Sequence, residues 1–337
     1  MRILIATDAW FPQINGVVRT LSTTVEMLRR AGHEVHLLTP EGRRTVPLPT
    51  YREIRLSLVT AAGIARTVEA VRPEAIHIAT EGSIGLALRH VCLRRGLPFT
   101  TGYHTRFPEY LSARIPLPGI ERGAYAFLRW FHGPSRAVMV PTRSMADVLE
   151  DHGFGNVRVW TRGVDHELFR PDRRMALEGK RPIALYAGRV AVEKGLDAFL
   201  ALPFEGTKYV VGDGPALEGL KARYPDARYT GYRMGEELAA TMAGADVFVF
   251  PSRTDTFGLV MLEALASGVP VAAYPVPGPR DVVVDGRVGG LDEDLGEAVR
   301  RALACDRAAC RDYALGFTWE KTAELFARYL APFEWPG

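Results

Sequence analysis

The chain has 337 residues, of which 47% are hydrophobic and 24% charged, and its formal net charge is +3. This is the composition of a globular protein with room for two domains. Asp8 interrupts the only apolar stretch near the N-terminus, which excludes a signal peptide, and no apolar run is long enough for a membrane-spanning helix. Three cysteines without a CxxC pair exclude a disulfide framework and a zinc site. We therefore expect a cytoplasmic protein.

The net charge is unevenly divided along the chain. Residues 1–168 hold 21 Arg and no Lys against 15 acidic residues, whereas the remainder holds 21 basic and 24 acidic residues. The two halves are therefore expected to attract different partners.

The first half alternates strand and helix patterns. Residues 17–31 carry apolar side chains at helical spacing between two short apolar runs. The predicted strands are Arg2–Thr7, Glu34–Thr39, Ala75–Ala79, Pro98–Gly102 and Ala137–Val140. Strands separated by helices indicate βαβ units and a parallel sheet.

A second series of the same kind follows. Its predicted strands are Ile183–Ala187, Tyr209–Val211, Ala227–Thr230, Val247–Phe250 and Val269–Ala273. The sequence thus predicts an α/β protein of two doubly wound domains, residues 1–168 and 169–316. The segment 317–337 is expected to form an amphipathic helix that packs back across the domain junction. Because ligands bind beyond the carboxyl ends of such strands, a cleft between two facing sheets is expected.

Two loops after predicted strands suit a diphosphate. The segment GRVAVEKG places Arg189 and Lys194 ahead of a helix. The alternative for this loop is a solvated surface turn. The second loop, between the first strand and the first helix, contains Asn15 and Gly16, and glycine lets backbone approach a ligand closely. The glycine turn at Gly212 is a weaker signal, since it lacks the GxGxxG spacing, and no Walker motif is present.

The stretch SRTDTFGLVMLEALASGVPVAAYP places two carboxylates around a helix N-terminus. Phe257, Gly258 and Leu259 present amides suited to a phosphate or to a leaving group. Asp255 precedes those amides, and Glu263 lies more than one turn into the helix, within reach of vicinal hydroxyls. A capping acid with a solvated helical Glu is the alternative, but with Arg189 and Lys194 nearby the set describes a pocket for a sugar nucleotide.

These motifs, in this order, resemble the retaining glycosyltransferases of family 4, which have the GT-B fold of two Rossmann-like domains. The family pattern E-x7-E corresponds here to Asp255-x7-Glu263, and the GRxxxEKG, VGDGP, GVD and FPQINGV segments also match. The resemblance spans nearly the whole chain. It implies transfer of a sugar from a nucleotide donor with retention at the anomeric carbon.

The resemblance also implies roles for single residues. Arg189 and Lys194 would bind the donor diphosphate, and Glu263 the ribose. Gly16 and the amides of residues 257–259 would contact phosphates, and Asp255 would hold sugar hydroxyls. His104 would lie beside the reacting sugar, although a lone histidine at a strand exit can equally be structural. The resemblance implies that the diphosphate leaves from the same face of the sugar on which the acceptor attacks, and that the leaving phosphate helps to deprotonate the acceptor.

The first acid of the pair is Asp where the family usually has Glu, so the identity of the transferred sugar is left open. The segments TDTFG and LEALASG are similar to the lipid-directed branch of sulfoquinovosyl, glucuronosyl and mannosyl transferases. We expect a UDP-sugar donor, glucuronic acid or glucose, and a lipid acceptor such as diacylglycerol or ceramide. The alternatives are a GDP-mannose-dependent mannosyltransferase and a non-catalytic nucleotide-sugar-binding regulator. No metal is expected, and the DED at 292–294 lies far from the donor motifs.

The acceptor side is expected in the first half, where basic and aromatic residues interleave. The residues singled out are Arg114, Arg122, Tyr125, Arg129 and Trp130. Such a set suits docking on the anionic inner face of a membrane, although part of the aromatic set can be core. A nucleic-acid partner is not expected, because no matching motif accompanies the charge.

Overall fold

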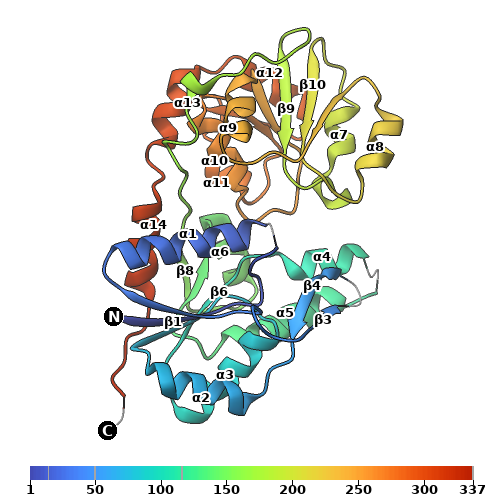
Figure 1. Cartoon of the computed structure of the whole chain (residues 1–337). Coiled ribbons are helices and arrows are strands. Elements are labelled where there is room, and N and C mark those ends of the chain that lie inside the picture. Colours follow the sequence, from blue (N-terminus) through green and yellow to red (C-terminus); the bar gives the residue numbers. More distant parts are fainter. Residues whose placement is uncertain (14, 49–50, 115–116, 336–337) are drawn as a thin grey trace. The chain divides into compact units, whose positions relative to one another are not determined.

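The computed structural model describes residues 1–13, 15–48, 51–114 and 117–335. Its contacts divide the chain into two compact units (Figure 1). Unit 1 comprises Met1–Thr161 with Trp319–Gly337, and unit 2 comprises Arg162–Thr318. Each unit is built on a parallel sheet, so the predicted α/β class is confirmed.

Unit 1 contains a six-stranded parallel sheet in the order β2-β1-β5-β6-β7-β8. The strands are β1 (Arg2–Ala6), β2 (Glu34–Leu38), β5 (Ala75–Ile78), β6 (Thr100–Gly102), β7 (Val138–Val140) and β8 (Val157–Val159). The helices are α1 (Gly16–Arg30), α2 (Ala61–Val71), α3 (Ser83–Arg95), α4 (Phe107–Arg114), α5 (Ile120–His132), α6 (Arg143–Asp151) and α14 (Trp319–Tyr329). A hairpin of β3 (Thr45–Leu48) and β4 (Tyr51–Ser57) is antiparallel.

Both faces of this sheet are covered, which explains its continuous apolar strands. Ile3 and Ile5 of β1 pack in a cluster with side chains of α1 and α14. Leu4 and Ala6 point the other way and pack with α2 and α3. The sequence predicted five of the six strands. It missed β8, whose three residues include a charged one, and the hairpin.

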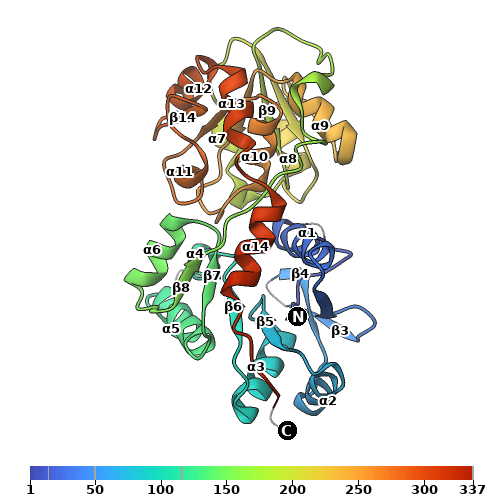
Figure 2. The same ribbon diagram turned by 90° about the vertical axis from the view of Figure 1, so that its left-hand side faces the viewer.

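Helix α14 belongs to the core of unit 1, where it lies beside α1 (Figure 2). Phe326 is buried, and the indole Nε1 of Trp160 donates a hydrogen bond to the carbonyl of Thr322 at 2.9 Å. The amphipathic helix predicted near the C-terminus is therefore present, and its apolar face covers the sheet of unit 1.

Unit 2 contains a second parallel sheet in the order β11-β10-β9-β12-β13-β14. The strands are β9 (Ile183–Ala187), β10 (Thr207–Val211), β11 (Arg228–Gly231), β12 (Val247–Phe250), β13 (Val271–Ala273) and β14 (Gly289–Leu291). The α-helices are α7 (Leu196–Leu200), α8 (Leu217–Arg223), α9 (Gly235–Gly244), α10 (Leu259–Ala266), α11 (Pro279–Val282), α12 (Leu295–Leu303) and α13 (Arg307–Ala314). All five predicted strands are confirmed, and β14, which begins with two glycines, was missed.

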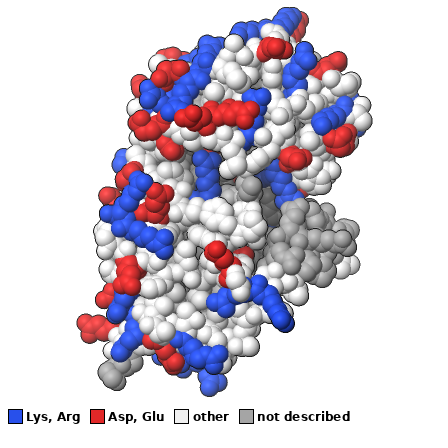
Figure 3. All heavy atoms as spheres, viewed as in Figure 1, with Lys and Arg blue, Asp and Glu red and all other residues white. Residues whose placement is uncertain are grey.

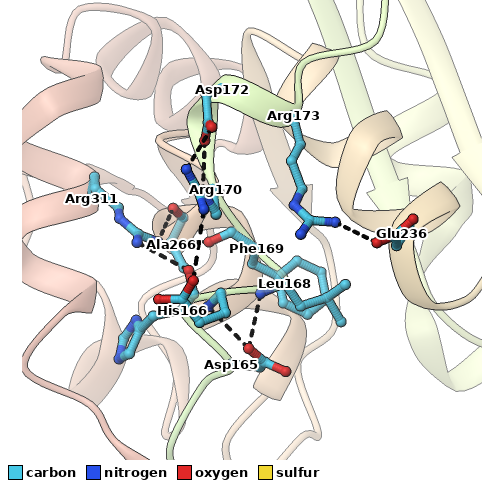
Figure 4. Close-up of polar contacts among 11 residues, drawn as sticks. Asp165, His166, Leu168, Phe169, Arg170, Asp172, Arg173, Glu236, Ala266 and Arg311 are labelled. Atoms are coloured by element: carbon cyan, nitrogen blue, oxygen red, sulfur yellow. Dashed lines mark hydrogen bonds and ion pairs between the residues drawn. The ribbon is translucent and has the colours of Figure 1, made fainter.

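The first segment of unit 2, residues 165–170, is held to the rest of the unit by hydrogen bonds between side chains and main-chain atoms (Figure 4). Asp165 Oδ1 accepts hydrogen bonds from the amides of Glu167 and Leu168. Arg311 of α13 donates to the carbonyl oxygens of His166, Phe169 and Ala266 at 2.6–3.0 Å. One guanidinium thus ties the opening segment to the end of α10.

Replacing Arg311 should destabilise unit 2. Arg311→Met keeps the aliphatic stem but removes three charge-assisted hydrogen bonds, so we expect the free energy of unfolding to fall by about 2 kcal/mol or more. Urea denaturation measures the change. The control is Arg300→Met, because Arg300 is solvent-exposed and pairs with Glu297 on the same helix. Equal midpoints for the two variants would contradict the role given to Arg311.

Candidate functional site

The loops of unit 2 that carry the predicted donor residues meet at one place in its sheet. From β9 the chain proceeds through β10 to β11 on one side, and then from β12 through β13 to β14 on the other. The strand order therefore reverses between β9 and β12, and ligands of doubly wound sheets bind outside the carboxyl ends at such a point. Arg189 and Lys194 follow β9, and Asp255 follows β12.

Lys194 and Asp255 form an ion pair across this point. Lys194 Nζ donates to Asp255 Oδ1 at 2.6 Å, and each side chain is 21% exposed. Asp255 Oδ2 is buried, and no described residue donates a hydrogen bond to it. The pair therefore places an ammonium against a carboxylate in a partly dehydrated setting.

Tyr186 fixes the start of the same loop. Its hydroxyl donates to the carbonyl of Arg189 at 2.8 Å. Burial raises the pKa of Tyr186 well above its usual range, and the carboxylates of Asp255 and Glu193 raise it further. Tyr186 therefore stays protonated and remains a hydrogen-bond donor. This role of Tyr186 could not be predicted from the sequence, since a Tyr inside a buried strand carries no local signal.

The glycine turns at 188 and 212 pack directly on each other. A Cβ added at Gly212, whose φ is +140°, would lie 1.8 Å from the carbonyl oxygen of Gly188. The amide of Gly188 in turn donates to the carbonyl of Val211 at 2.9 Å. This close approach explains the glycine at 212 by packing alone.

Helix α10 begins at a residue without a side chain. Its N-cap is Gly258, with φ +82°, and no side-chain hydrogen bond caps the helix. Phe257 is buried against the core, and Glu263 is only 3% exposed. Gly278 after β13 packs on the backbone of Asp255. The loop that carries Asp255 is thus fixed by the buried Phe257 and by its contact with Gly278.

In unit 1, two helix N-termini are already satisfied by internal groups. Asn15 Oδ1 accepts from the amides of Val17 and Val18 at 3.0 Å, which caps α1 and leaves Gly16 exposed beside it. The buried carboxylate of Asp8 performs the same task for α3. It accepts hydrogen bonds from Thr80, Ser83 and two main-chain amides, while burial raises its pKa.

His104 lies two residues after the end of β6 in unit 1. It is half-buried, and its ring meets that of Trp160 edge to face at 5.8 Å. The predicted site residues therefore divide between the two units. Asn15, Gly16 and His104 lie in unit 1, and the remaining donor residues lie in unit 2.

The residues predicted for an acceptor or membrane surface also divide. On α5, Arg122, Arg129 and Trp130 are exposed, and Arg129 donates to the carbonyl of His152. Tyr125, in contrast, is 2% exposed and stacks on the His152 ring at 3.6 Å. It points to the buried face of α5 and cannot be part of an exposed surface. The side chain of Arg114 lies outside the described residues.

The acidic run at 292–294 is occupied by local contacts. Asp294 caps α12, and Asp292 accepts from the amide of Asp294 at 2.9 Å. Glu293 forms an ion pair with Arg253, whose guanidinium lies 3.6 Å from the ring centroid of Tyr274. Within the described part of the chain, no group of three or more His, Cys, Asp or Glu side chains could hold a metal ion.

The glycine contact generates a testable expectation. Gly212→Ala places a methyl group against the Gly188 carbonyl at a φ that L-residues rarely adopt, so we expect a loss of about 3 kcal/mol or more in unfolding free energy. Gly219→Ala is the control, because Gly219 lies in α8 with no atom within 4 Å of the added Cβ. Helix propensity should make that variant slightly more stable. A Gly212→Ala protein as stable as the control would refute the packing account.

Comparison with known proteins agrees with this architecture. Residues 14–168 match the model of Glycosyltransferase Family 4, and residues 181–305 match Glycosyl transferases group 1. A GDP-mannose-dependent alpha-mannosyltransferase of Mycobacterium tuberculosis is 31% identical, over 98% of this chain and 97% of its own. Alpha-monoglucosyldiacylglycerol synthase of Streptococcus pneumoniae is 27% identical, over 90% and 78%.

Among solved structures, sucrose-phosphate synthase from Thermosynechococcus elongatus has a TM-score of 0.78 and 20% identity, with 97% of each chain covered. This likeness extends to the whole two-unit fold and confirms the predicted GT-B architecture. Together with the full-length sequence similarity, it leads to one conclusion: the chain belongs to glycosyltransferase family 4 and is a glycosyltransferase.

Proposed function

We propose that the enzyme transfers a sugar from a nucleoside diphosphate sugar to a lipid acceptor, with retention at the anomeric carbon. The Lys194–Asp255 pair at the reversal point of the unit 2 sheet is the observation that carries this proposal. It combines a cation for a diphosphate with a carboxylate oxygen for sugar hydroxyls. Arg189, on the same loop, adds a second cation.

The chemistry follows from these groups. As the bond between the anomeric carbon and the diphosphate breaks, negative charge grows on the leaving phosphate. Lys194, Arg189 and the amides at the start of α10 stabilise that charge, so the step requires no metal ion. The leaving phosphate accepts the proton of the acceptor hydroxyl as that oxygen bonds to the anomeric carbon from the same face. Within unit 2, Glu263 binds the ribose.

Three sugar nucleotides are candidate donors for this site. The sequence favours UDP-glucuronic acid or UDP-glucose. The mycobacterial relative, by its name, uses GDP-mannose, and its 31% identity over nearly the whole chain supports GDP-mannose for this enzyme about equally. The Asp at position 255, one methylene shorter than Glu, alters the reach toward the sugar in either case.

The lipid acceptor is supported by the streptococcal relative, whose name, alpha-monoglucosyldiacylglycerol synthase, is that of a glycolipid synthase, and by α5. Trp130 is 53% exposed and Phe127 lies beside it, with ring centroids 5.8 Å apart; Arg122 and Arg129 are on the same helix. In the described ranges no helix is long and apolar enough to cross a membrane. Basic and acidic side chains intermingle on the face shown in Figure 3. We therefore propose that α5 supplies the contact with an anionic bilayer.

Donor binding tests the proposed site. Calorimetric titration with UDP, GDP and the three sugar nucleotides should show selective binding that survives EDTA. Lys194→Met should weaken that binding about tenfold or more, because a charge-assisted contact to the diphosphate is lost. The control is Lys221→Met, since Lys221 pairs with Glu218 on the surface of α8. Wild-type affinity in the Lys194 variant would refute the assigned diphosphate site.

Membrane docking is tested separately by vesicle sedimentation. The Arg122→Ser/Trp130→Ser protein should bind vesicles containing anionic phospholipid at least about fivefold more weakly than the wild type, given about 1 kcal/mol per basic residue near the surface. Arg300→Ser/Leu315→Ser, an exposed pair in unit 2, serves as the control. Binding that ignores both the anionic lipid and the α5 changes would exclude this surface.

A further inference from the structure

An open cavity of about 510 Å³ lies at the amino ends of the strands of unit 2. Its walls include Pro182 directly before β9, Asp246 directly before β12 and Pro270 directly before β13. The proposed donor loops follow the carboxyl ends of β9 and β12. Because the strands are parallel, the cavity lies at the opposite edge of the same sheet and is separate from the proposed donor site.

Basic side chains outnumber acidic ones at this edge. Arg181 and Arg307 line the cavity, and Arg174 reaches the same carboxylate, with its Nη2 3.7 Å from Asp246 Oδ1. Among the carboxylates of the described residues, Asp246 alone lies within 4.0 Å of these three guanidiniums. Three positive charges therefore meet one negative charge, which leaves a surplus of two positive charges.

Two of these guanidiniums are held in place by hydrogen bonds. Arg307 donates to the carbonyl oxygens of Ala245 and Ala243 at 2.6 and 3.0 Å. Arg181 Nη1 donates to both carboxylate oxygens of Asp246 at 2.6 Å. Since a guanidinium has five N–H groups, Arg181 and Arg307 retain donors for a ligand. Their fixed positions lower the entropic cost of binding one.

The arginines also repel one another. Burial lowers the pKa of Arg307, and the charges of Arg174 and Arg181 lower it further, while Asp246 acts in the opposite direction. The three guanidiniums are thus close enough to interact in a partly dehydrated setting. An anion bound between them would relieve this repulsion.

We propose that this cavity binds a phosphate group, either as the free ion or as the monoester of a small molecule. A phosphate monoester carries between about 1.5 and 2 negative charges at pH 7, which matches the surplus of positive charge. The planar fork of a guanidinium suits pairs of phosphate oxygens. Pro182, Pro270 and Leu303 supply an apolar wall for the remainder of a monoester.

Cys305 provides a local test, because its thiol lines the cavity. Cys92 and Cys310 are fully buried, whereas Cys305 is partly exposed. Burial raises the pKa of Cys305, so its alkylation by iodoacetamide is followed in mildly alkaline buffer by peptide mass spectrometry. Inorganic phosphate or glycerol 3-phosphate should slow the reaction, and potassium chloride at equal ionic strength should not. Protection by either compound supports the site, and stronger protection by the ester identifies a phosphorylated small molecule as its ligand.

Two pairs of variants make the test specific. Arg174→Ser should weaken phosphate binding about tenfold, because a charge-assisted contact is lost. Its control is Arg228→Ser, an exposed arginine of β11. Leu303→Glu adds a negative charge to the exposed wall residue and should abolish the protection, whereas the isosteric Leu303→Gln should retain it.

Three results would overturn the proposal. The first is a wild-type Cys305 whose alkylation neither phosphate compound slows more than chloride does. The second is equal protection in the two Leu303 variants, and the third is equal protection in Arg174→Ser and Arg228→Ser. The outcome does not depend on the proposed reaction, since the thiol reports only on the cavity at the amino ends of the strands.

Discussion

The chemistry of this protein is confined by the burial of its two parallel sheets on both faces. Strands β9 and β12 consist of side chains that are almost wholly excluded from water. A parallel strand of this kind can present polar groups only where it ends. The loops after β9 and β12 end side by side at the reversal of strand order, and this places Lys194 against Asp255. The buried strands of unit 2 thus hold the two loops, and with them Lys194 and Asp255, next to each other.

Helix N-termini near the strand ends are treated in two different ways. Asn15 caps α1, and the buried Asp8 accepts from the first amides of α3, so an internal oxygen meets the positive end of each helix. Helix α10 begins instead at Gly258, which has no side chain to accept a hydrogen bond. The positive end of α10 is thereby suited to a phosphate of the donor.

Much of the fold could be predicted because buried strands are visible in the sequence as apolar runs between turn residues. Strands β8 and β14 could not, since three residues containing Arg158 or two glycines carry little periodicity. The ordered loop motifs identified the family, but the Lys194–Asp255 contact joins residues 61 positions apart and is visible only in the structure. The regular spacing of arginines predicts that Tyr125 belongs to an exposed surface. That spacing does not show which face of α5 is buried, and Tyr125 lies on the buried face.

We propose that this glycosyltransferase moves a sugar onto a lipid with retention. The most direct measurement incubates the enzyme with each of UDP-glucose, UDP-glucuronic acid and GDP-mannose on vesicles containing diacylglycerol, and determines the anomeric configuration of any glycolipid by proton NMR. We expect that one donor gives an α-linked product in the presence of EDTA. A β-linked product, or no glycolipid from a protein that binds the nucleotide, would contradict it.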